Sequence, residues 1–300
     1  MNRPYACNLY FLIVREVTMI HSDWHIHTSA SYDAKLPLEQ LIADAKAQGL
    51  RGFGITDHLN YNDESFWGNI RESAANFKRL RSEFPGMRLG VELTPISKPL
   101  LDHLAAGGTR DNWVPPMDAM PYAVELPATK EELMALGIQY AIGASHWHVD
   151  GPEHHPKVPV EDQIREWHRQ QMYMACDERV TILGHPWTCN LSWYGDFRII
   201  PASMHDEFAA ALKENGKFAE CNCSMFTGYD TSEYFRNQYA EYMRYLFEKG
   251  IPITIGTDCH GSSAHNDYPD RRAIYETYLA KAGFQEGDFT DLPDSALWQV

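Results

Sequence analysis

Two histidines near the start of the chain have the spacing of a metal-binding pair. His25 and His27 lie in a segment with the character of a strand, and the apolar Ile26 between them would point the other way, into packing. Side chains alternate between the two faces of a strand, so histidines one residue apart point the same way and can reach one metal ion. The spacing recurs in Asp258-x-His260, where a carboxylate and an imidazole would share a face. With 14 histidines some close pairs arise by chance, so the motif needs support from the rest of the chain.

Metal-binding side chains occur at or just past the carboxyl ends of seven predicted strands. In a parallel α/β barrel these ends meet at one mouth, where active sites are built, whereas scattered structural histidines would not select that position. The donors exceed one tetrahedral site and predict at least two divalent ions. Mixed imidazole and carboxylate ligands suit Zn, Fe or Mn. The candidates are His25, His27, His58, Glu92, His146, His185, Glu220, Asp258 and His260.

The elements that would position these residues alternate along the chain. Short apolar runs are followed by amphipathic stretches, which is typical of repeated βα units and of an α/β fold. The predicted strands cover 20–25, 52–56, 87–93, 138–144, 180–183, 217–220 and 251–256. The predicted helices cover 36–49, 65–84, a segment from about 129, 160–176, 202–215, 231–249 and 271–280. Thr129 and Glu132 have the spacing of a capping box, which supports the third helix.

We predict one barrel domain over residues 19–300, preceded by an extension over residues 1–18. Residues 94–126 are rich in Pro and Gly without a clear period, and we expect an irregular insertion there, over one end of the barrel. The apolar run 9–14 is too short to cross a bilayer and lacks a cleavage site, so no signal peptide is expected.

The composition excludes some classes of partner. The net charge of −15 opposes binding to long nucleic acids or to anionic membranes, which requires clustered Lys and Arg. The six cysteines show no C-x-x-C spacing, which indicates reduced thiols and a cytoplasmic protein.

The motifs together resemble the PHP (polymerase and histidinol phosphatase) family of metal-dependent phosphoesterases, and in particular its stand-alone histidinol-phosphatase-like members. The resemblance extends over about residues 20–280. It depends on six short motifs: Asp23-x-His25-x-His27-Thr28, Thr56-Asp57-His58, Gly90-Val91-Glu92, Gly143-x-x-His146-Trp147, Gly184-His185-Pro186 and Gly256-Thr257-Asp258-x-His260. The family fold implies a distorted (β/α)7 barrel with a trinuclear metal centre at the carboxyl ends of the strands.

The resemblance also implies a distribution of ligands. His25, His27, Glu92 and Asp258 would hold the first metal. Glu92 would bridge to the second metal, which His146 and His185 complete. The third would take His58, His260 and Asp33, at a position that is His or Asp in the family. Glu220 and Asn222 resemble a Glu-x-Asn stretch near the family site.

Other residues have two interpretations each. Asp57 would face away from His58 on a strand, so we expect it to act by hydrogen bonding, with metal ligation as the second interpretation. As a catalytic residue it would donate a proton to the leaving group. His148 could replace His146 but fits the family spacing less well. Lys35, Arg110 and Arg198 lie in loops near strand ends as candidate phosphate-binding residues, although solvated surface charges are the commoner case.

The resulting hypothesis is a hydrolase that cleaves a phosphate monoester of a small metabolite with metal-activated hydroxide. The alternative is a phosphodiesterase that acts on a nucleotide or small diester with the same metals. A non-catalytic module on a retained barrel would have lost ligands, and no expected ligand is missing here.

Overall fold

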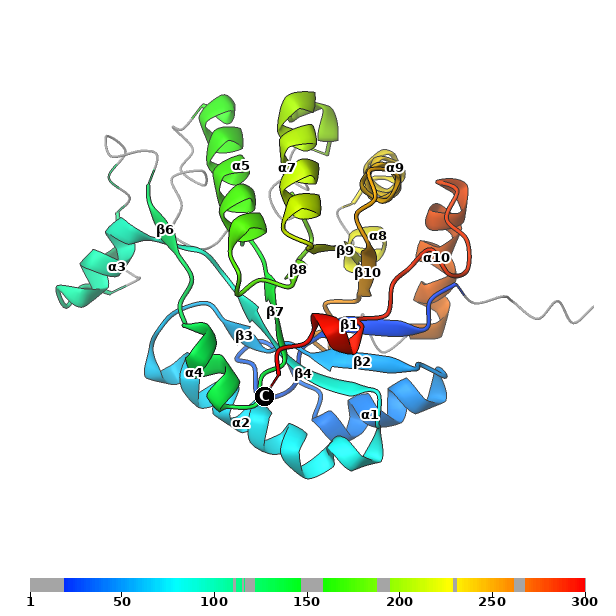
Figure 1. Ribbon diagram of the computed structural model, residues 1–300, viewed down its shortest axis with the longest axis horizontal. Coiled ribbons are helices and arrows are strands. Elements are labelled where there is room, and N and C mark those ends of the chain that lie inside the picture. Colours follow the sequence, from blue (N-terminus) through cyan, green and yellow to red (C-terminus); the bar gives the residue numbers. More distant parts are fainter. Residues whose placement is uncertain are drawn as a thin grey trace, which may run out of the picture.

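Seven parallel strands form a nearly closed barrel with helices outside it (Figure 1). The computed structural model describes residues 19–109, 112–114, 116, 122–146, 159–187, 195–228, 231–261 and 268–299. The order around the barrel is β1-β2-β4-β7-β8-β9-β10, and the short strand β3 pairs with β4. The strands are β1 (Ser22–Ile26), β2 (Gly52–Ile55), β3 (His58–Leu59), β4 (Met87–Leu93), β7 (Tyr140–Gly143), β8 (Ile182–Leu183), β9 (Phe218–Asn222) and β10 (Ile253–Gly256). The predicted distorted (β/α)7 barrel is therefore confirmed.

The helices cover the outer surface of the barrel. In Figure 1, α1, α2 and α4 lie below β1, β2 and β4, whereas α5, α7, α9 and α10 lie on the side of β7 to β10. They are α1 (Leu38–Ala47), α2 (Glu64–Leu80), α3 (Lys98–Ala105), α4 (Lys130–Ala135), α5 (Val160–Cys176), α7 (Ala202–Glu214), α8 (Ser224–Thr227), α9 (Glu233–Glu248) and α10 (Tyr268–Lys281). The capping box predicted for Thr129 and Glu132 is present at the start of α4.

The barrel closes where the first and last strands meet. Ile26 and Cys259 form a parallel bridge. The amide of His27 donates to the carbonyl of Cys259 at 3.0 Å, and the amide of Asp258 donates to the carbonyl of His25 at 2.8 Å. The two motifs with period-two spacing are thus hydrogen-bonded to each other, although 231 residues separate His27 from Asp258.

The barrel interior changes character along the strands. On β9, Phe218, Glu220 and Asn222 share one face because side chains alternate. Phe218 packs in an apolar cluster that includes Tyr140, whereas Glu220 contacts His25 near the carboxyl end. The Tyr140 ring needs the space left by a glycine, because a Cβ at Gly54 would lie 1.7 Å from its hydroxyl. An apolar floor therefore underlies a polar mouth.

The insertion is more regular than predicted. Within residues 94–126, strands β5 (Ile96–Ser97) and β6 (Val124–Glu125) pair antiparallel, and α3 begins directly after β5. Strands of two residues are too short to show an alternating pattern, so sequence periodicity misses them. Helix α2 ends at Leu80, before the predicted residue 84, because the 3-10 turn Arg81–Glu83 follows it.

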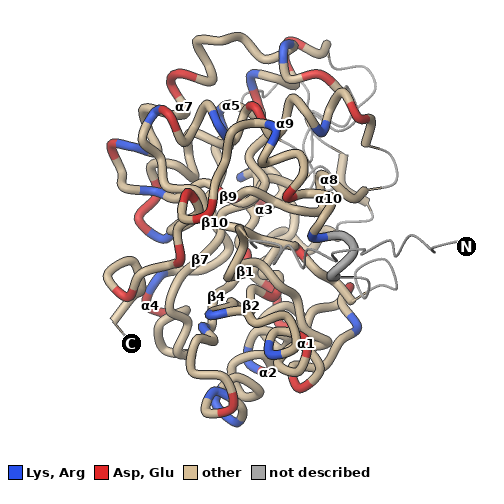
Figure 2. The backbone as a smooth tube through the Cα atoms, turned by 90° about the vertical axis from the view of Figure 1, so that its right-hand side faces the viewer, with Lys and Arg blue, Asp and Glu red and all other residues tan. Residues whose placement is uncertain are grey.

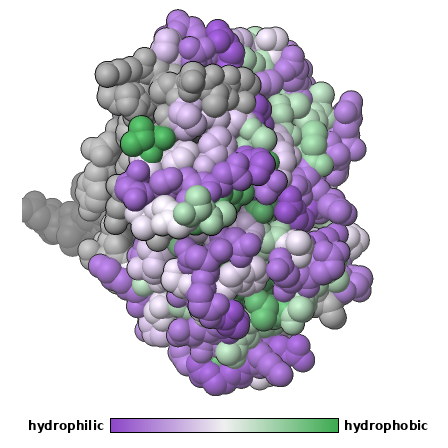
Figure 3. Space-filling view, turned by 90° about the vertical axis from the view of Figure 1, so that its left-hand side faces the viewer, coloured by the Kyte–Doolittle hydropathy of each residue, from purple (hydrophilic) through white to green (hydrophobic). Residues whose placement is uncertain are grey.

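The surface carries no large basic stripe in the part of the chain that the structure describes. Figure 2 shows Lys and Arg interspersed with Asp and Glu along the chain. On the face in Figure 3, hydrophilic residues predominate and hydrophobic residues occur in small groups. No described helix is long and apolar enough to span a membrane. The predicted extension over residues 1–18 lies outside the described residues.

Candidate metal centre

The structure brings together, at the carboxyl ends of the strands, the nine ligands that the family resemblance implies: His25, His27, Asp33, His58, Glu92, His146, His185, Asp258 and His260. They come from β1, β3 and β4, from the loop after β1, and from the segments that directly follow β7, β8 and β10. Three groups of these residues place their donor atoms within 4.8 Å of one another: His25, His27 and Glu92; His27, His58 and His260; and His58, Glu92 and His146.

The first group is centred on the two histidines of β1. Nε2 of His25 lies 3.1 Å from Nε2 of His27. Asp258 Oδ1 lies 3.1 Å from Nε2 of His27 and 3.6 Å from Nε2 of His25. Glu92 Oε2 lies 3.4 Å and 3.5 Å from the same two nitrogens. These four side chains are the ones predicted for the first metal.

Glu92 connects this group to the other two. Its Oε1 lies 3.2 Å from Nε2 of His146 and 3.2 Å from Nε2 of His185. Its Oε2 lies 2.7 Å from Nδ1 of His58. The carboxylate is fully buried and central, as a bridging ligand would be.

The third group lies on the outer side of the mouth. Asp33 Oδ2 lies 3.2 Å from Nε2 of His58 and 3.4 Å from Nε2 of His260. The two imidazoles face each other with their Nε2 atoms 3.3 Å apart. Asp33 is in the loop after β1, so its distance from His58 and His260 depends on the tertiary structure and not on the spacing of residues along a strand.

Hydrogen bonds at Nδ1 fix the tautomers of His25, His260 and His146, so that Nε2 of each neutral ring points a lone pair toward the cluster. Nδ1 of His25 lies 2.7 Å from Glu220 Oε1, and Nδ1 of His260 lies 2.9 Å from the carbonyl of Asp258. Carboxylates and carbonyls only accept hydrogen bonds, so both Nδ1 atoms carry hydrogen. In the neutral imidazole, Nε2 then presents a lone pair.

His146 is oriented by a longer chain of hydrogen bonds. Thr94 Oγ1 donates to Asn60 Oδ1 at 2.7 Å, so the hydrogen bond of 2.8 Å between Thr94 Oγ1 and His146 Nδ1 has the imidazole as donor. Nε2 of His146 therefore also presents a lone pair, and it faces Glu92. Asn60 and Thr94 were not predicted as site residues, because polar residues at strand ends have no distinctive spacing.

This donor set fits divalent cations. Nε2 of the neutral His25 ring directs a lone pair at carboxylate oxygens of Glu92 and Asp258, 3.4 Å and 3.6 Å away, an arrangement that repels unless a positive charge lies between them. Nδ1 of His58 and Oε2 of Glu92 are buried and lie 2.7 Å apart, but the angles between them are not those of a hydrogen bond. An imidazole whose Nδ1 donates to a carboxylate is a common arrangement at metal sites.

The ionisation of the cluster suits metal binding. Burial lowers the pKa of His27 to about 3 and that of His146 to about 4, so both are neutral at pH 7. Although burial alone would raise it, the neighbouring imidazoles hold the pKa of Glu92 well below its usual range. Against the effect of burial, Glu92 and Asp33 raise the pKa of His58 to about 10, and Glu220, Glu92 and Asp258 raise the pKa of His25. The carboxylates of the cluster therefore favour positive charge at these two rings, which bound cations would supply in place of protons.

The backbone is strained where two of the ligands lie. His185 has φ 27° and Asp258 has φ 54°, in the left-handed region that non-glycine residues rarely adopt. Trp187, at φ 70°, is buried and its indole donates to Tyr242 at 3.0 Å, which anchors the turn after His185. Gly256 leaves space for Glu220, because a Cβ there would lie 1.9 Å from Glu220 Oε1.

Asp57 is buried beneath the first loop. Its carboxylate accepts hydrogen bonds from the amide of Thr28 at 2.6 Å and from the Thr28 hydroxyl at 2.7 Å. Burial raises the pKa of Asp57 to about 6. These contacts fit the hydrogen-bonding role, and proton donation remains a prediction.

The predicted substrate residues have different positions. Lys35 is exposed on the loop that carries Asp33, and its amide donates to the carbonyl of His260 at 3.1 Å. Arg198 pairs with Asp196, and its side chain is 75% exposed. Arg110 and His148 lie outside the described residues.

Supporting residues also include Asp23 and Asn222. Asp23 accepts from the amide of Thr257 at 2.9 Å and so fixes the segment before Asp258. Asn222 Nδ2 donates to Asp258 Oδ2 at 3.2 Å. Both lie within motifs that the sequence analysis identified, but their roles depend on contacts between distant segments.

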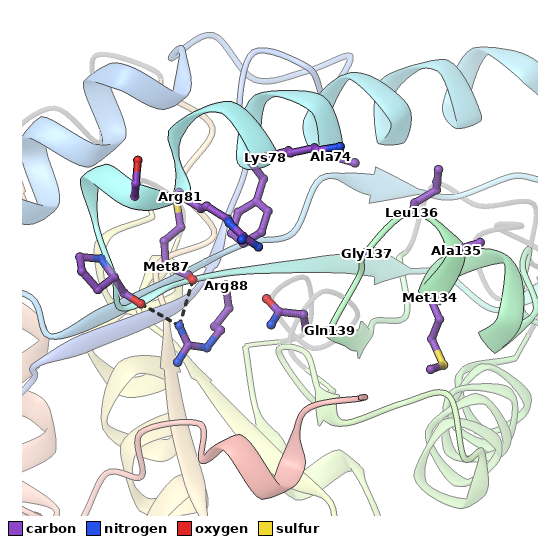
Figure 4. Close-up of a pocket in the computed structure, with 13 residues that line it drawn as sticks. Ala74, Lys78, Arg81, Met87, Arg88, Met134, Ala135, Leu136, Gly137 and Gln139 are labelled. Carbon is purple, nitrogen blue, oxygen red and sulfur yellow. Dashed lines mark hydrogen bonds between the residues drawn. The ribbon is translucent and has the colours of Figure 1, made fainter. Parts of the chain in front are cut away.

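A surface cavity of about 800 Å³ lies at the opposite ends of the strands (Figure 4). Its lining comes from α2, the start of β4 and the turn before β7, and includes Lys78, Arg81, Arg88 and Gln139. The Arg88 guanidinium donates to the carbonyls of Pro85 and Met87. None of the nine candidate ligands lines this cavity, so it is separate from the cluster.

The chain is similar to solved structures of two groups of phosphatases. A histidinol phosphate phosphatase (HisK) from Lactococcus lactis subsp. lactis, solved with Zn, L-histidinol and phosphate, has 19% identity and a TM-score of 0.61, and the match covers 90% of this chain and 98% of that one. A structure from work on YwqE from Bacillus subtilis and CpsB from Streptococcus pneumoniae, described as metal-dependent tyrosine phosphatases, has 16% identity and a TM-score of 0.45 over 89% of each chain.

The sequence comparisons identify a protein family but no individual curated protein that is similar to the chain. No curated protein sequence matches the chain. A profile of the PHP domain matches residues 23–283, which include all nine candidate ligands. The chain therefore belongs to the PHP domain family, the family that its motifs resemble.

Proposed function

We propose that this protein is a metal-dependent hydrolase that cleaves phosphate monoesters of small metabolites. The observation that carries the proposal is the convergence of imidazole lone pairs and carboxylate oxygens around the buried Glu92. Membership of the PHP domain family supports it. The related HisK was solved with zinc, histidinol and phosphate, which makes a small phosphorylated substrate a reasonable expectation here.

Two to three divalent cations, Zn, Fe or Mn, would occupy the centre. His25, His27, Glu92 and Asp258 would hold the first; Glu92, His146 and His185 the second; and Asp33, His58 and His260 the third. When bound, such ions lower the pKa of water to supply hydroxide near neutral pH and neutralise charge on the phosphoryl oxygens.

The residues of the chain set the geometry for this chemistry. Glu220 and Thr94 hold His25 and His146 in the tautomer that presents Nε2. Asp57 fixes Thr28, and with it the start of the loop that carries Asp33 and Lys35. Lys35, exposed on that loop, would attract a phosphate dianion. Asp57, if protonated, would serve as the proton donor to the departing alkoxide.

The remaining expectations concern partners and location. Small substrates and no long nucleic acid fit the net charge of −15 and the interspersed charges in Figure 2. The described cysteines, Cys176, Cys221, Cys223 and Cys259, carry free thiols, which fits a cytoplasmic location.

Phosphate release with and without metal tests the proposal. The chelated protein should release no phosphate from p-nitrophenyl phosphate, and Mn, Fe or Zn should restore release. The diester bis(p-nitrophenyl) phosphate, assayed in parallel, should be turned over more slowly. Faster turnover of the diester would favour the phosphodiesterase alternative. Full activity in protein shown to be metal-free by elemental analysis would refute the proposal.

A further inference from the structure

An exposed tyrosine lies beside the metal centre. Tyr32 immediately precedes Asp33 in the loop after β1, and the residue is 56% exposed. Its ring centroid lies 5.6 Å from that of His58, at an interplanar angle of 35°. The His58 side chain is only 5% exposed, so the exposed Tyr32 lies on the solvent-facing side of this candidate ligand.

This ring is held in place despite its exposure. Phe66 of α2 packs against it in an edge-to-face contact, with centroids 5.5 Å apart and planes at 77°. Asn60 Nδ2 donates to the Tyr32 hydroxyl at 3.4 Å, and Asn60 also accepts from Thr94. The loop backbone is fixed next to it, because the Lys35 amide donates to the carbonyl of His260. The ring is therefore pre-oriented, which reduces the entropy cost of a contact with a ligand.

The position of Tyr32 differs from that of the other exposed large hydrophobic side chains in the described residues. These are Val114, Tyr234 and Ile274, and none of them has a ring contact with a residue of the cluster. Tyr234, for example, lies on α9 beneath the Arg198 guanidinium.

We propose that Tyr32 is a specificity-determining residue that packs against the leaving group of the substrate. The inference rests on the proposed phosphatase function. A phosphoryl group bound by the cluster directs its ester oxygen and leaving group toward the mouth, where the Tyr32 ring stands. The preferred substrates are phosphate monoesters that carry an aromatic or heteroaromatic ring near the ester oxygen, because two rings gain from stacked or edge-to-face contact beyond simple burial.

A pair of substrates of matched size isolates the contribution of the ring. Benzyl phosphate and cyclohexylmethyl phosphate have similar bulk, and both release a primary alcohol, so they differ mainly in aromaticity. The wild-type, metal-loaded protein should have a kcat/KM about three- to ten-fold higher for benzyl phosphate, the size of one favourable ring contact. Tyr32→Leu should reduce this ratio to about 1, whereas Tyr32→Phe should keep it.

Binding gives a readout that is independent of turnover. Benzylphosphonate and cyclohexylmethylphosphonate lack the hydrolysable ester bond, and calorimetry of the metal-loaded protein should show the same preference and the same loss in Tyr32→Leu. Tyr234→Leu is the matched control, because it removes a tyrosine that is 49% exposed and should leave both ratios unchanged.

The outcomes separate this inference from the proposed function. If the wild type releases phosphate from p-nitrophenyl phosphate but from neither ester, the proposed substrate preference fails while the function stands. If it releases phosphate from none of the three, the phosphatase proposal fails, and the phosphonates still test the ring. If phosphate is released but Tyr32→Leu keeps the wild-type ratio of kcat/KM for the two esters, the role proposed for Tyr32 is wrong, whereas the proposed phosphatase function stands. Loss of the preference in Tyr32→Phe would assign the effect to the hydroxyl and overturn the ring contact. Failure of both phosphonates to bind would also overturn it.

Discussion

Glu220 accepts a hydrogen bond from Nδ1 of His25 at 2.7 Å, across 195 residues of sequence. This contact fixes the tautomer of His25 and directs its Nε2 toward Glu92 and Asp258. Glu220 also accepts from the amide of His185 at 2.5 Å. One carboxylate that lies behind the ligands therefore positions two of them.

Replacement of Glu220 should weaken metal binding without removing a ligand. Glu220→Ala deletes the acceptor for His25, and such outer-shell changes typically cost about 10- to 100-fold in metal affinity. Zinc affinity measured by competition with a chromophoric chelator checks this. Glu214→Ala, at the end of α7, is the control. Equal affinities in Glu220→Ala and the wild type would contradict the positioning role.

Glu92 should be indispensable to the whole centre. Glu92→Gln keeps the shape of the side chain but removes the charge that faces His58, His146 and His185. We expect the metal content, measured by elemental analysis, to fall. The rate of phosphate release should fall by more than about 100-fold, which is the largest effect typical of replacing a residue that only supports a ligand. Glu125→Gln, exposed on β6, should behave like the wild type. Retention of the full metal content in Glu92→Gln would disprove a bridging role.

Gly256 should tolerate no side chain. In Gly256→Ala the new Cβ would lie 1.9 Å from Glu220 Oε1, so Glu220 must move away from His25. Overpacking of this kind costs about 1–3 kcal/mol of stability, and metal affinity should fall as well. Thermal unfolding with and without metal measures both effects.

Gly68→Ala provides the matched control. Gly68 lies in α2, and no atom is within 4 Å of a Cβ built there. Alanine should raise the stability of that helix by about 0.5–1 kcal/mol. The prediction for Gly256 fails if both variants show the same stability.

The partly buried His205 should make the protein less stable in acid. Burial lowers the pKa of His205, whose ring packs against Trp187 and Tyr242. With the folded-state pKa below the unfolded value of about 6.5, the unfolded chain takes up the proton first. The contribution of neutral His205 to the free energy of unfolding is therefore complete above about pH 6.5 and declines as the pH falls toward the folded-state pKa. Melting temperatures at pH 7.5 and 5.5 should differ less in His205→Gln than in the wild type; an unchanged difference would exclude this role.

Much of the barrel was predictable because its signals are local. Apolar runs such as 251–256 and the capping box at Thr129 depend on residues close in sequence, so they predict strands and helices. The helix over 160–176 was predicted with the bounds that α5 has. Strands β5 and β6 of the insertion were missed, because two residues show no periodicity.

The sequence by itself determined which side chains can bind metal and that they follow strand ends, since spacing and residue type carry that information. The tertiary structure decided how these side chains are arranged: that Glu92 occupies the centre, that Glu220 and Thr94 select the tautomers of His25 and His146, and that Tyr32 stands at the mouth. These relationships join segments far apart in the chain. Local patterns do not encode the distances between such segments, which are fixed only when the strands close into the barrel.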